Sequence, residues 1–229
     1  MLNREFVFLD FGGTLAYTTN TREKAIVASL AALDHSFTPE QVVPAVATAR
    51  ERFAGRSPGG LTYPQRQEFF IGLYQVVAEA LGFGADARKV AEHLWETQQD
   101  HYELYPDTMP GLQALRAQGL RLGIISNWDK LNLAVVCRSL GIAAFFDVIL
   151  PSAEAGADKP DPRIFRRAFE LAQVEPELSA HVGDSYSADV QGARGVGIAG
   201  ILVQREGDLE FDCPTVRGLD EVPDLLGRL

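Results

Sequence analysis

The chain has 229 residues, of which 46% are hydrophobic, and its formal net charge at pH 7 is −10. This length and apolar content allow a full hydrophobic core and argue against a disordered chain. The acidic balance favours neither a nucleic-acid partner nor an anionic membrane surface. No apolar run is long enough to span a bilayer, and no basic-then-apolar leader opens the chain. We therefore expect a soluble cytoplasmic protein.

The first predicted element is a buried strand over residues 6–9, whose sequence FVFL leads directly into Asp10. Two glycines and a threonine follow in the stretch DFGGTL. Glycines at this point let the backbone approach a ligand closely. Asp10 is therefore displayed at a strand end as a candidate functional residue, and the main-chain carbonyl of Gly12 is a candidate metal ligand.

Residues 18–100 show helix signals and no clear strand pattern. Asn20, Thr38 and Thr62 each precede a Glu or Gln by three residues, which is the spacing of a capping box. The stretch AGRSPGGLTYP interrupts the helical pattern and predicts a loop. We therefore expect a separate all-helical domain at 18–100, inserted between the first strand and the rest of the chain.

From Tyr105 onward, strand and helix patterns alternate. Strands are predicted in LRLGIIS, DVIL, AHVGD and IAGILV. Helices are predicted in PGLQALRAQG, LNLAVVCRSLG, DPRIFRRAFELAQ and SADVQGARG, with a last helix near DEVPDLLGRL. Repeated β-α units imply right-handed crossovers and a mainly parallel sheet with helices on both faces. The predicted fold class is therefore α/β, with one domain formed by residues 1–17 and 101–229.

Polar side chains follow four of the predicted strands at the points where those strands end. These residues are Asp10; Ser126 and Asn127; Lys159, which lies beyond DVIL in GADKPDP; and Asp184 with Asp189. The carboxyl ends of parallel strands lie along one edge of a sheet, and ligands bind outside that edge. We therefore expect these side chains to converge there, including one of only four lysines in the chain.

This set of side chains suits a phosphoryl group and a hard cation. Clustered carboxylates repel one another unless a cation lies between them, and a small number of oxygen ligands suits Mg²⁺. Lys159, Ser126 and backbone amides would supply positive charge and hydrogen-bond donors to phosphate oxygens. Asp10 is then the nucleophile, because carboxylates form aspartyl-phosphate intermediates. Each motif alone also fits an ordinary turn or helix cap, so the interpretation depends on their order and placement together.

The segments DFGGTL, IISN, KPDP and GDSYSAD resemble, in the same order, the four motifs of the haloacid dehalogenase-like hydrolase superfamily. The resemblance covers the core, and the helical segment resembles that superfamily's α-helical cap. It implies a Rossmann-like core, dependence on Mg²⁺ and hydrolysis of a small phosphorylated metabolite, and it names no protein partner. It also implies a role for each candidate. Asp10 is the nucleophile and a metal ligand, Ser126 and Lys159 hold the phosphoryl group, and Asn127 lines the substrate space. Gly12, Asp184 and Asp189 belong to the metal site, where Asp189 acts through water or hydrogen bonds.

The chain departs from the superfamily pattern at Gly12. Phosphatases of the superfamily usually carry an aspartate there, which protonates the leaving oxygen and then activates water. Such general acid–base help contributes ~10²–10⁴-fold to the rate. The first interpretation is a phosphatase of reduced or substrate-restricted activity, in which a water, the substrate or a cap residue covers part of the role. The alternative is a catalytically silent member that binds a metabolite or a protein partner.

Two other reactions of the superfamily rank below these interpretations. Superfamily members that cleave carbon–halogen bonds also lack this aspartate but need no metal, whereas Asp184 and Asp189 favour a cation site. Members that cleave carbon–phosphorus bonds have a small residue there and use a cap lysine as a Schiff base. The lysines of the helical segment are Lys24, just after the hinge, and Lys89.

Overall fold

The structure is a computed structural model, and it describes residues 4–97 and 101–228. The chain divides into two compact units. Met1–Tyr17 and Tyr102–Leu229 form one, which we call the α/β unit, and Thr18–His101 form the other, which we call the helical unit. Within the described ranges, no helix is both long enough and apolar enough to cross a membrane.

The α/β unit is built on a six-stranded parallel sheet in the order β5-β4-β1-β6-β7-β8. Its strands are β1 (Phe6–Leu9), β4 (Arg121–Ser126), β5 (Val148–Pro151), β6 (Ser179–Gly183), β7 (Ala199–Val203) and β8 (Thr215–Val216). Its α-helices are α5 (Thr108–Ala117), α6 (Leu133–Ser139), α7 (Ser152–Ala155), α8 (Pro162–Ala172), α9 (Gly192–Gly195) and α10 (Val222–Leu226). The predicted α/β class with a mainly parallel, Rossmann-like sheet is confirmed.

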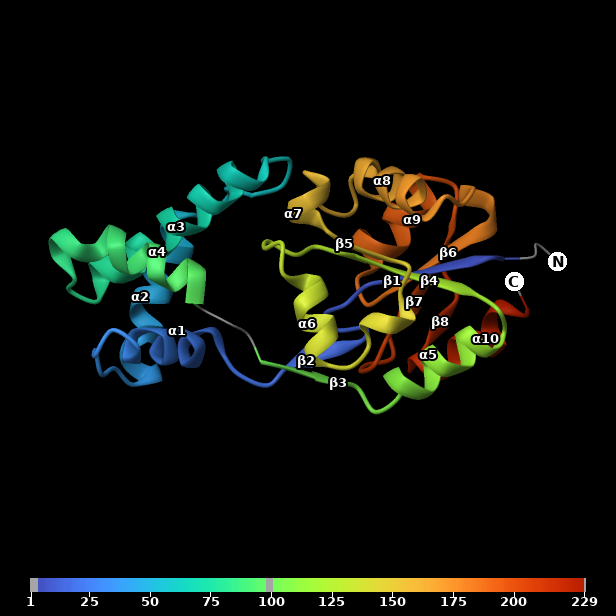
Figure 1. Cartoon of the computed structure of the whole chain (residues 1–229), viewed down its shortest axis with the longest axis horizontal. Coiled ribbons are helices and arrows are strands. Elements are labelled where there is room, and N and C mark those ends of the chain that lie inside the picture. The colour runs from blue at the N-terminus through green and yellow to red at the C-terminus, as the bar shows by residue number, and fades with distance from the viewer. Residues whose placement is uncertain (1–3, 98–100, 229) are drawn as a thin grey trace. The chain divides into compact units, whose positions relative to one another are not determined.

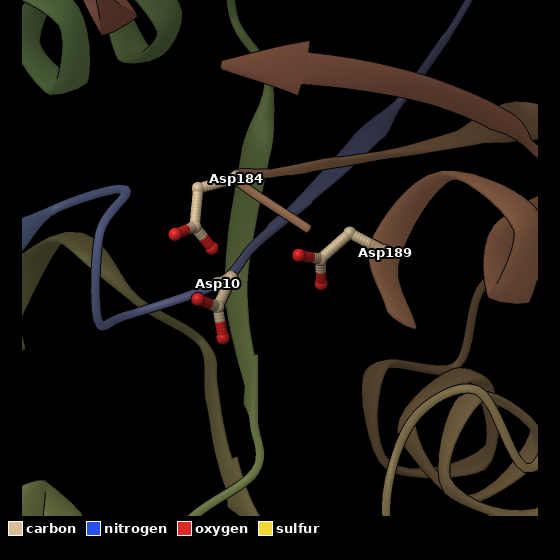
Figure 2. A group of neighbouring side chains, drawn as sticks. All are labelled: Asp10, Asp184 and Asp189. Carbon is tan, nitrogen blue, oxygen red and sulfur yellow. The ribbon is translucent and has the colours of Figure 1, made fainter. Parts of the chain in front are cut away.

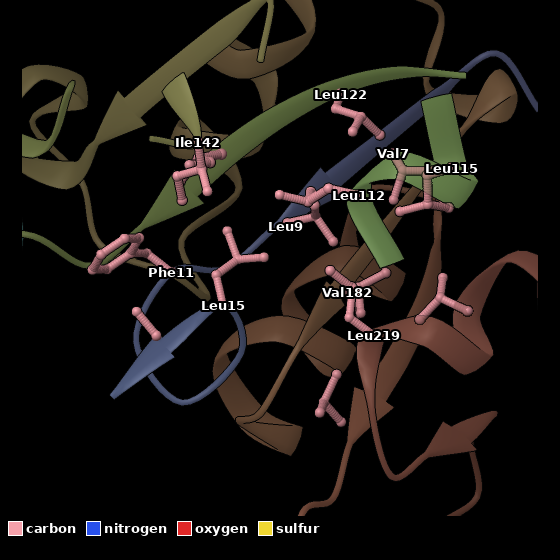
Figure 3. Close-up of a cluster of buried hydrophobic side chains, with 14 of the residues drawn as sticks. Val7, Leu9, Phe11, Leu15, Leu112, Leu115, Leu122, Ile142, Val182 and Leu219 are labelled. Atoms are coloured by element: carbon pink, nitrogen blue, oxygen red, sulfur yellow. The ribbon is translucent and has the colours of Figure 1, made fainter. Parts of the chain in front are cut away.

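Both faces of this sheet are covered by helices, as Figure 1 shows for α8 and α9 on one side and α5, α6 and α10 on the other. Successive side chains of a strand point to opposite faces. Phe6 and Phe8 of β1 accordingly pack with α8, whereas Val7 and Leu9 pack in the cluster with α5 and α6 shown in Figure 3. The continuous apolar run of β1 thus reflects a strand buried on both faces.

Three features of the α/β unit differ from the sequence expectations. A separate two-stranded sheet pairs β2 (Ala16–Thr18) with β3 (Tyr102–Leu104), and both strands are too short to give an alternating pattern. The segment SADVQGARG, expected to be one α-helix, is a π-helix (Tyr186–Gln191) followed by the short α9. The strand β8 has only two residues and was not predicted.

The helical unit consists of α1 (Arg22–Ala31), α2 (Pro39–Arg52), α3 (Tyr63–Ala80) and α4 (Ala87–Thr97), with a short 3₁₀ turn at Gly84–Asp86. Its own core includes Leu30, Val46, Val77 and Leu94. Thr38 caps α2 through the predicted capping box with Gln41. The prediction for the first helix was wrong, because Thr21 rather than Asn20 caps α1. The side chain of Asn20 instead accepts a hydrogen bond from the backbone N–H of His101.

The two cysteines, both free, lie in different environments. Burial raises the pKa of the Cys137 thiol on α6 to about 12, whereas Cys213 is only partly buried. Because the thiolate is the reactive form, we expect Ellman's reagent to label one thiol of the folded chain rapidly and the second only after unfolding. Cys213→Ser should remove the fast phase. Rapid labelling of both thiols under native conditions would contradict the burial of Cys137.

Candidate active site

The sheet register brings three strand ends together at one edge. Leu9 of β1 lies opposite Ile124 of β4 on one side and opposite Val182 of β6 on the other. Asp10, Ser126 and Asp184, which come just after these positions, therefore end neighbouring strands. The backbone N–H of Asp10 donates to the carbonyl of Val182 at 2.8 Å, which continues the pairing of β1 with β6 through the aspartate. Asp10 and Ser126 are buried, at 7% and 3% exposure.

Lys159 joins two of the candidate carboxylates. Its Nζ lies 2.6 Å from Oδ1 of Asp10 and 2.6 Å from Oδ1 of Asp189. The lysine side chain is only 2% exposed, so this ammonium is removed from water and held between two anions. A buried charge is tolerated only when it is paired in this way. Lys159 and Asp10 are 149 positions apart in the chain, and the structure brings them into direct contact.

Asn127 holds the backbone of the same lysine. Its Nδ2 donates to the carbonyl of Lys159 at 3.0 Å, and its Oδ1 accepts from the backbone N–H of Lys159 at 2.7 Å. This two-point contact ties the loop before α8 to the end of β4. Since both amide atoms are engaged, the observed role of Asn127 is to position Lys159. Its predicted place in the substrate space stays a prediction.

Asp189 is surrounded by hydrogen-bond donors. Its Oδ1 accepts from Lys159 and lies 2.8 Å from Nε2 of the buried His181, and its Oδ2 accepts from the backbone N–H of Ser185 at 2.9 Å. Because a carboxylate only accepts, Nε2 carries the proton of this imidazole. A Cβ on Gly183 would lie 2.1 Å from Cγ of Asp189, so the carboxylate occupies space that only glycine leaves open. Asp189 therefore orients Lys159.

The π-helix Tyr186–Gln191 delivers Asp189 to this position. It begins at Ser185, whose Oγ accepts from the backbone N–H of Ala188. The carbonyl of Ser185 accepts from the N–H groups of both Asp189 and Val190, at 2.8 and 3.4 Å. The widened turn thus closes on the same residue whose N–H holds the Asp189 carboxylate.

Asp184 completes a cluster of carboxylates at the sheet edge. One oxygen each of Asp10, Asp184 and Asp189 lie within 4.8 Å of one another, and Figure 2 shows the three side chains around a common space. Asp184 is exposed, unlike the other two. A Cβ on Gly13, which has φ +75°, would lie 2.0 Å from Oδ2 of Asp184. The backbone at Gly13 thus forms a cradle for this carboxylate.

The charges of the cluster do not balance by themselves. Burial raises the pKa of Asp10, because the adjacent Lys159 ammonium offsets only part of its cost. Burial also raises the pKa of Asp184, and the nearby Asp189 adds to this effect. Burial alone would raise the pKa of Asp189, but the Lys159 ammonium lowers it. Burial alone would lower the pKa of Lys159, but the carboxylates of Asp10 and Asp189 raise it. Three carboxylates facing one ammonium fit a divalent cation with oxygen ligands.

Position 12 offers no side chain beside this cluster. Gly12 lies on the turn after β1, and a Cβ there would meet no heavy atom within 4 Å. The turn is closed by hydrogen bonds from the N–H groups of Leu15 and Ala16 to the carbonyl of Phe11. The position at which phosphatases of the superfamily usually carry an aspartate is therefore open space in this structure. Gly12 was also predicted to offer its carbonyl to a metal, and this stays a prediction.

Arg205, which sequence reasoning missed, fastens the same turn. It follows β7 and donates to the carbonyls of Gly13 and Thr14 at 3.1 and 2.6 Å. Its guanidinium also forms a two-point ion pair with Asp107 and lies 3.5 Å from the centre of the Tyr105 ring. The turn that cradles Asp184 is thereby tied to the segment that follows β3. No local motif signals this role, since the arginine lies 192 positions from Gly13.

Asp107→Asn tests the strength of this connection. Burial alone would raise the pKa of Asp107. The hydrogen bonds from Arg205 and from the backbone N–H of Leu219 nevertheless hold this pKa below its usual range. We expect the variant to lose about 1.5–3 kcal/mol of unfolding free energy at pH 7. Because the pKa is lowered on folding, this stabilisation is present above the unfolded value of about 4 and is lost as the pH falls through the folded value.

Denaturant melts of Asp107→Asn and wild type at neutral pH and at about pH 3 measure this dependence. The difference between the two proteins should narrow at the lower pH. Asp208→Asn is the control, because its side chain is 94% exposed and its ion pair with Arg217 lies in water. An Asp107→Asn difference that is unchanged at both pH values would contradict a charge-dependent role.

Sequence reasoning also weighed two lysines of the helical unit. Lys24 and Lys89, the candidates for Schiff-base chemistry, are both exposed on helices of the helical unit. Trp128, which follows Asn127, packs edge-on against Phe11 and donates from Nε1 to Asn132. His181 is fully buried in β6 and also supports Asp189.

The sequence pattern of the haloacid dehalogenase-like hydrolases matches residues 5–197. The chain therefore belongs to the haloacid dehalogenase-like hydrolase family, and the resemblance seen in the motifs is confirmed. Among solved structures, a 2-haloacid dehalogenase from Pseudomonas syringae pv. Tomato DC3000 superposes with a TM-score of 0.73 at 25% identity, covering 98% of this chain and 99% of that one. The HAD-hydrolase YfnB from Bacillus subtilis, solved with magnesium, shares the fold with a TM-score of 0.68 at 19% identity, covering 98% and 99%.

Curated relatives match over part of their sequences. Haloacid dehalogenase-like hydrolase domain-containing protein 3 of Bos taurus is 39% identical over 136 residues, 58% of this chain and 52% of its own. Glyceraldehyde 3-phosphate phosphatase of Methanopyrus kandleri is 33% identical over 144 residues, 60% and 57% of the two chains. Phosphoserine phosphatase of Thermus thermophilus is 36% identical over 131 residues, 57% and 52%. The matches thus span about half the length of these relatives.

Proposed function

We propose that this family member is a Mg²⁺-dependent phosphatase of a small phosphorylated metabolite, with Asp10 as the nucleophile. The observation that carries the proposal is the buried Lys159 ammonium, which lies 2.6 Å from both Asp10 and Asp189 at the edge where Asp184 also lies. A cation fixed beside a carboxylate at a strand end suits capture of a phosphoryl group by that carboxylate.

Each residue has a role in this proposal. Asp10 attacks phosphorus, and the Lys159 ammonium neutralises charge on the phosphoryl oxygens. Ser126, buried at the end of β4, donates its hydroxyl to the same group. Asp10, Asp184 and the carbonyl of Gly12 would hold Mg²⁺, with Asp189 in support. When bound, Mg²⁺ supplies the positive charge that the carboxylate cluster lacks.

The names of the relatives agree with this chemistry. Two of the relatives described above are phosphatases of small phosphorylated metabolites, glyceraldehyde 3-phosphate and phosphoserine. The proposal extends the predicted domain roles, with residues 1–17 and 101–229 as catalytic core and residues 18–100 as cap. Closure of a cap excludes water from a phosphoryl site and completes substrate selection.

A panel of phosphorylated metabolites, assayed for phosphate release with Mg²⁺ and with EDTA, tests the proposal. Turnover that requires Mg²⁺ is the expected result. Absence of phosphate release from every compound, with metabolite binding retained in a thermal-shift assay, would instead support a catalytically silent member.

Carbon–halogen hydrolysis is the second candidate, because the structure of a 2-haloacid dehalogenase is similar to this one. Halide release from a short 2-haloacid, measured beside the phosphate panel, decides between the two. Halide release that does not depend on a metal would contradict the phosphatase proposal, because the reaction would then need no cation at the carboxylate cluster.

A further inference from the structure

A phosphatase that uses Asp10 has to expel the leaving group of its substrate. When an alkyl ester is cleaved, the leaving oxygen departs as an alkoxide, whose conjugate acid is about as weak as water, with a pKa of about 16. Departure of so poor a leaving group needs a proton donor beside the ester oxygen. Any such donor in the α/β unit has to carry a proton and face the turn after β1.

The turn itself offers no acidic side chain, since Gly12, Gly13 and Thr14 follow Phe11. Gly12, two positions beyond the nucleophile, has no side chain, and a Cβ there meets nothing within 4 Å. Gly12 is also not among the glycines with positive φ, so its backbone would accept another residue. The position therefore supplies neither an acid for the leaving group nor a base for water, although the space for one is present.

The neighbouring proton carriers are committed to other partners. Lys159 pairs with both Asp10 and Asp189, and loss of a proton would leave two buried carboxylates without a counter-charge. His181 is fully buried and donates to Asp189. Arg205 donates to the main chain of the turn and to a carboxylate behind it. None of these groups is free to protonate an ester oxygen.

Asp184, at the end of β6, and Ser126, at the end of β4, are further polar groups near the turn. Asp184 belongs to the proposed metal set, and the hydroxyl of Ser126 is as weak an acid as the alcohol that an alkyl ester would release. None of these groups at the described strand ends is therefore an acid suited to the leaving oxygen.

We propose that the substrate is an activated phosphoryl donor, an acyl phosphate or a phosphoanhydride, whose leaving group departs as a stable anion without receiving a proton. This inference rests on the proposed function and narrows the substrate class of the same site. Carboxylic acids have pKa values of about 4, and phosphate monoesters have a second pKa of about 6. Both leaving groups are therefore stable as anions at neutral pH.

The bonds and protons balance without an added acid. In the first step, a bond forms between an oxygen of Asp10 and phosphorus while the bond from phosphorus to the leaving oxygen breaks, and the leaving group keeps the electron pair. In the second step, water bonds to phosphorus and the bond to Asp10 breaks with its electron pair. The proton of the water passes to the released phosphate. Because no side chain at position 12 activates that water, the second step is slow and the phosphoenzyme accumulates.

The experiment compares kcat/KM, with Mg²⁺, across aryl phosphates of graded leaving-group acidity, with acetyl phosphate, pyrophosphate and glycerol phosphate added. For wild type we expect a steep fall in kcat/KM as the leaving group becomes more basic. Acetyl phosphate or pyrophosphate should exceed glycerol phosphate by at least ~10²-fold, the lower range of general-acid effects. The preferred member of that pair identifies the acyl or the anhydride source.

Gly12→Asp introduces the missing acid, and Gly12→Asn is the matched control of the same shape without a proton to give. Gly12→Asp should raise the ratio of kcat/KM for glycerol phosphate to kcat/KM for acetyl phosphate by ~10²–10⁴-fold and flatten the dependence on leaving-group acidity. Gly12→Asn should keep the steep dependence. If Gly12→Asp does not fold, the wild-type dependence decides alone.

The outcomes separate this inference from the proposed function. A shallow wild-type dependence, with glycerol phosphate cleaved as well as acetyl phosphate, overturns the inference and leaves the phosphatase standing. An acid supplied by the helical unit would give that result. If no compound is turned over in a manner that needs Mg²⁺ and Asp10, the proposed function fails and the inference fails with it.

Discussion

Asp10→Asn is expected to abolish Mg²⁺-dependent phosphate release, with a loss of about 10⁴-fold or more, the scale seen when a covalent nucleophile is removed. The amide has nearly the same shape as the carboxylate but is a poor nucleophile for phosphorus. It also withdraws one of the two anions that hold Lys159. Phosphate release with the best compound of the panel measures the loss. Mass spectrometry of quenched enzyme should show a phosphoryl adduct on wild type and none on the variant.

Asp208→Asn is the matched control for this change, because it makes the same substitution at a side chain that is 94% exposed. It should keep the wild-type rate. Circular dichroism should show that both variants are folded. If pure, folded Asp10→Asn retains the wild-type rate, Asp10 is not the nucleophile, and the assignment of the whole strand edge has to be revised.

Gly13→Ala is expected to displace the Asp184 carboxylate. The added Cβ would stand 2.0 Å from Oδ2 of Asp184, and φ at this position is +75°. A left-handed conformation costs an alanine about 1–2 kcal/mol in stability. Displacement of a site group by about 1 Å costs ~10²-fold in rate. We expect losses of this size in denaturant melts and in kcat/KM, together with weaker Mg²⁺ binding by isothermal titration calorimetry.

The neighbouring Gly12→Ala separates these effects from a general intolerance of the turn. Its Cβ meets nothing within 4 Å, and its φ does not require glycine. Its unfolding free energy should therefore change by less than about 1 kcal/mol, the ordinary range of surface substitutions. Equal destabilisation by both alanines would show that the cradle at Gly13 is not specific to Asp184.

Much of the site geometry was predictable because parallel strands end on one edge. Knowledge that Asp10, Ser126 and Asp184 each end a buried strand was enough to expect them along one edge of the sheet. The register shows in addition that their strands are neighbours. The contact of Lys159 with Asp10 was expected at the level of a shared edge. The sequence does not contain its 2.6 Å geometry, because the lysine lies in the connection between α7 and α8 and not on a strand.

Other parts of the site leave no periodic signal in the sequence. Arg205 and Asp107 form their ion pair across 98 positions, and an isolated charge in a loop is usually solvated. His181 lies within the apolar pattern of a strand, and nothing in that pattern indicates its contact with Asp189. The π-helix was expected to be α-helical, because one extra residue per turn alters spacing too little to be recognised in a short segment.

That widened turn makes the site sensitive to chain length as well as to residue identity. Removal of a single residue between Ser185 and Asp189 would let the segment relax to ordinary α-helical winding, which advances each residue by about 100°. The carboxylate that now holds both Lys159 and His181 would rotate away from them, although every side chain of the site would still be present. A sequence alignment that matches the acidic residues but allows a gap in this stretch would therefore place two kinds of chain in one group. In one kind the carboxylate contacts the lysine, and in the other it does not.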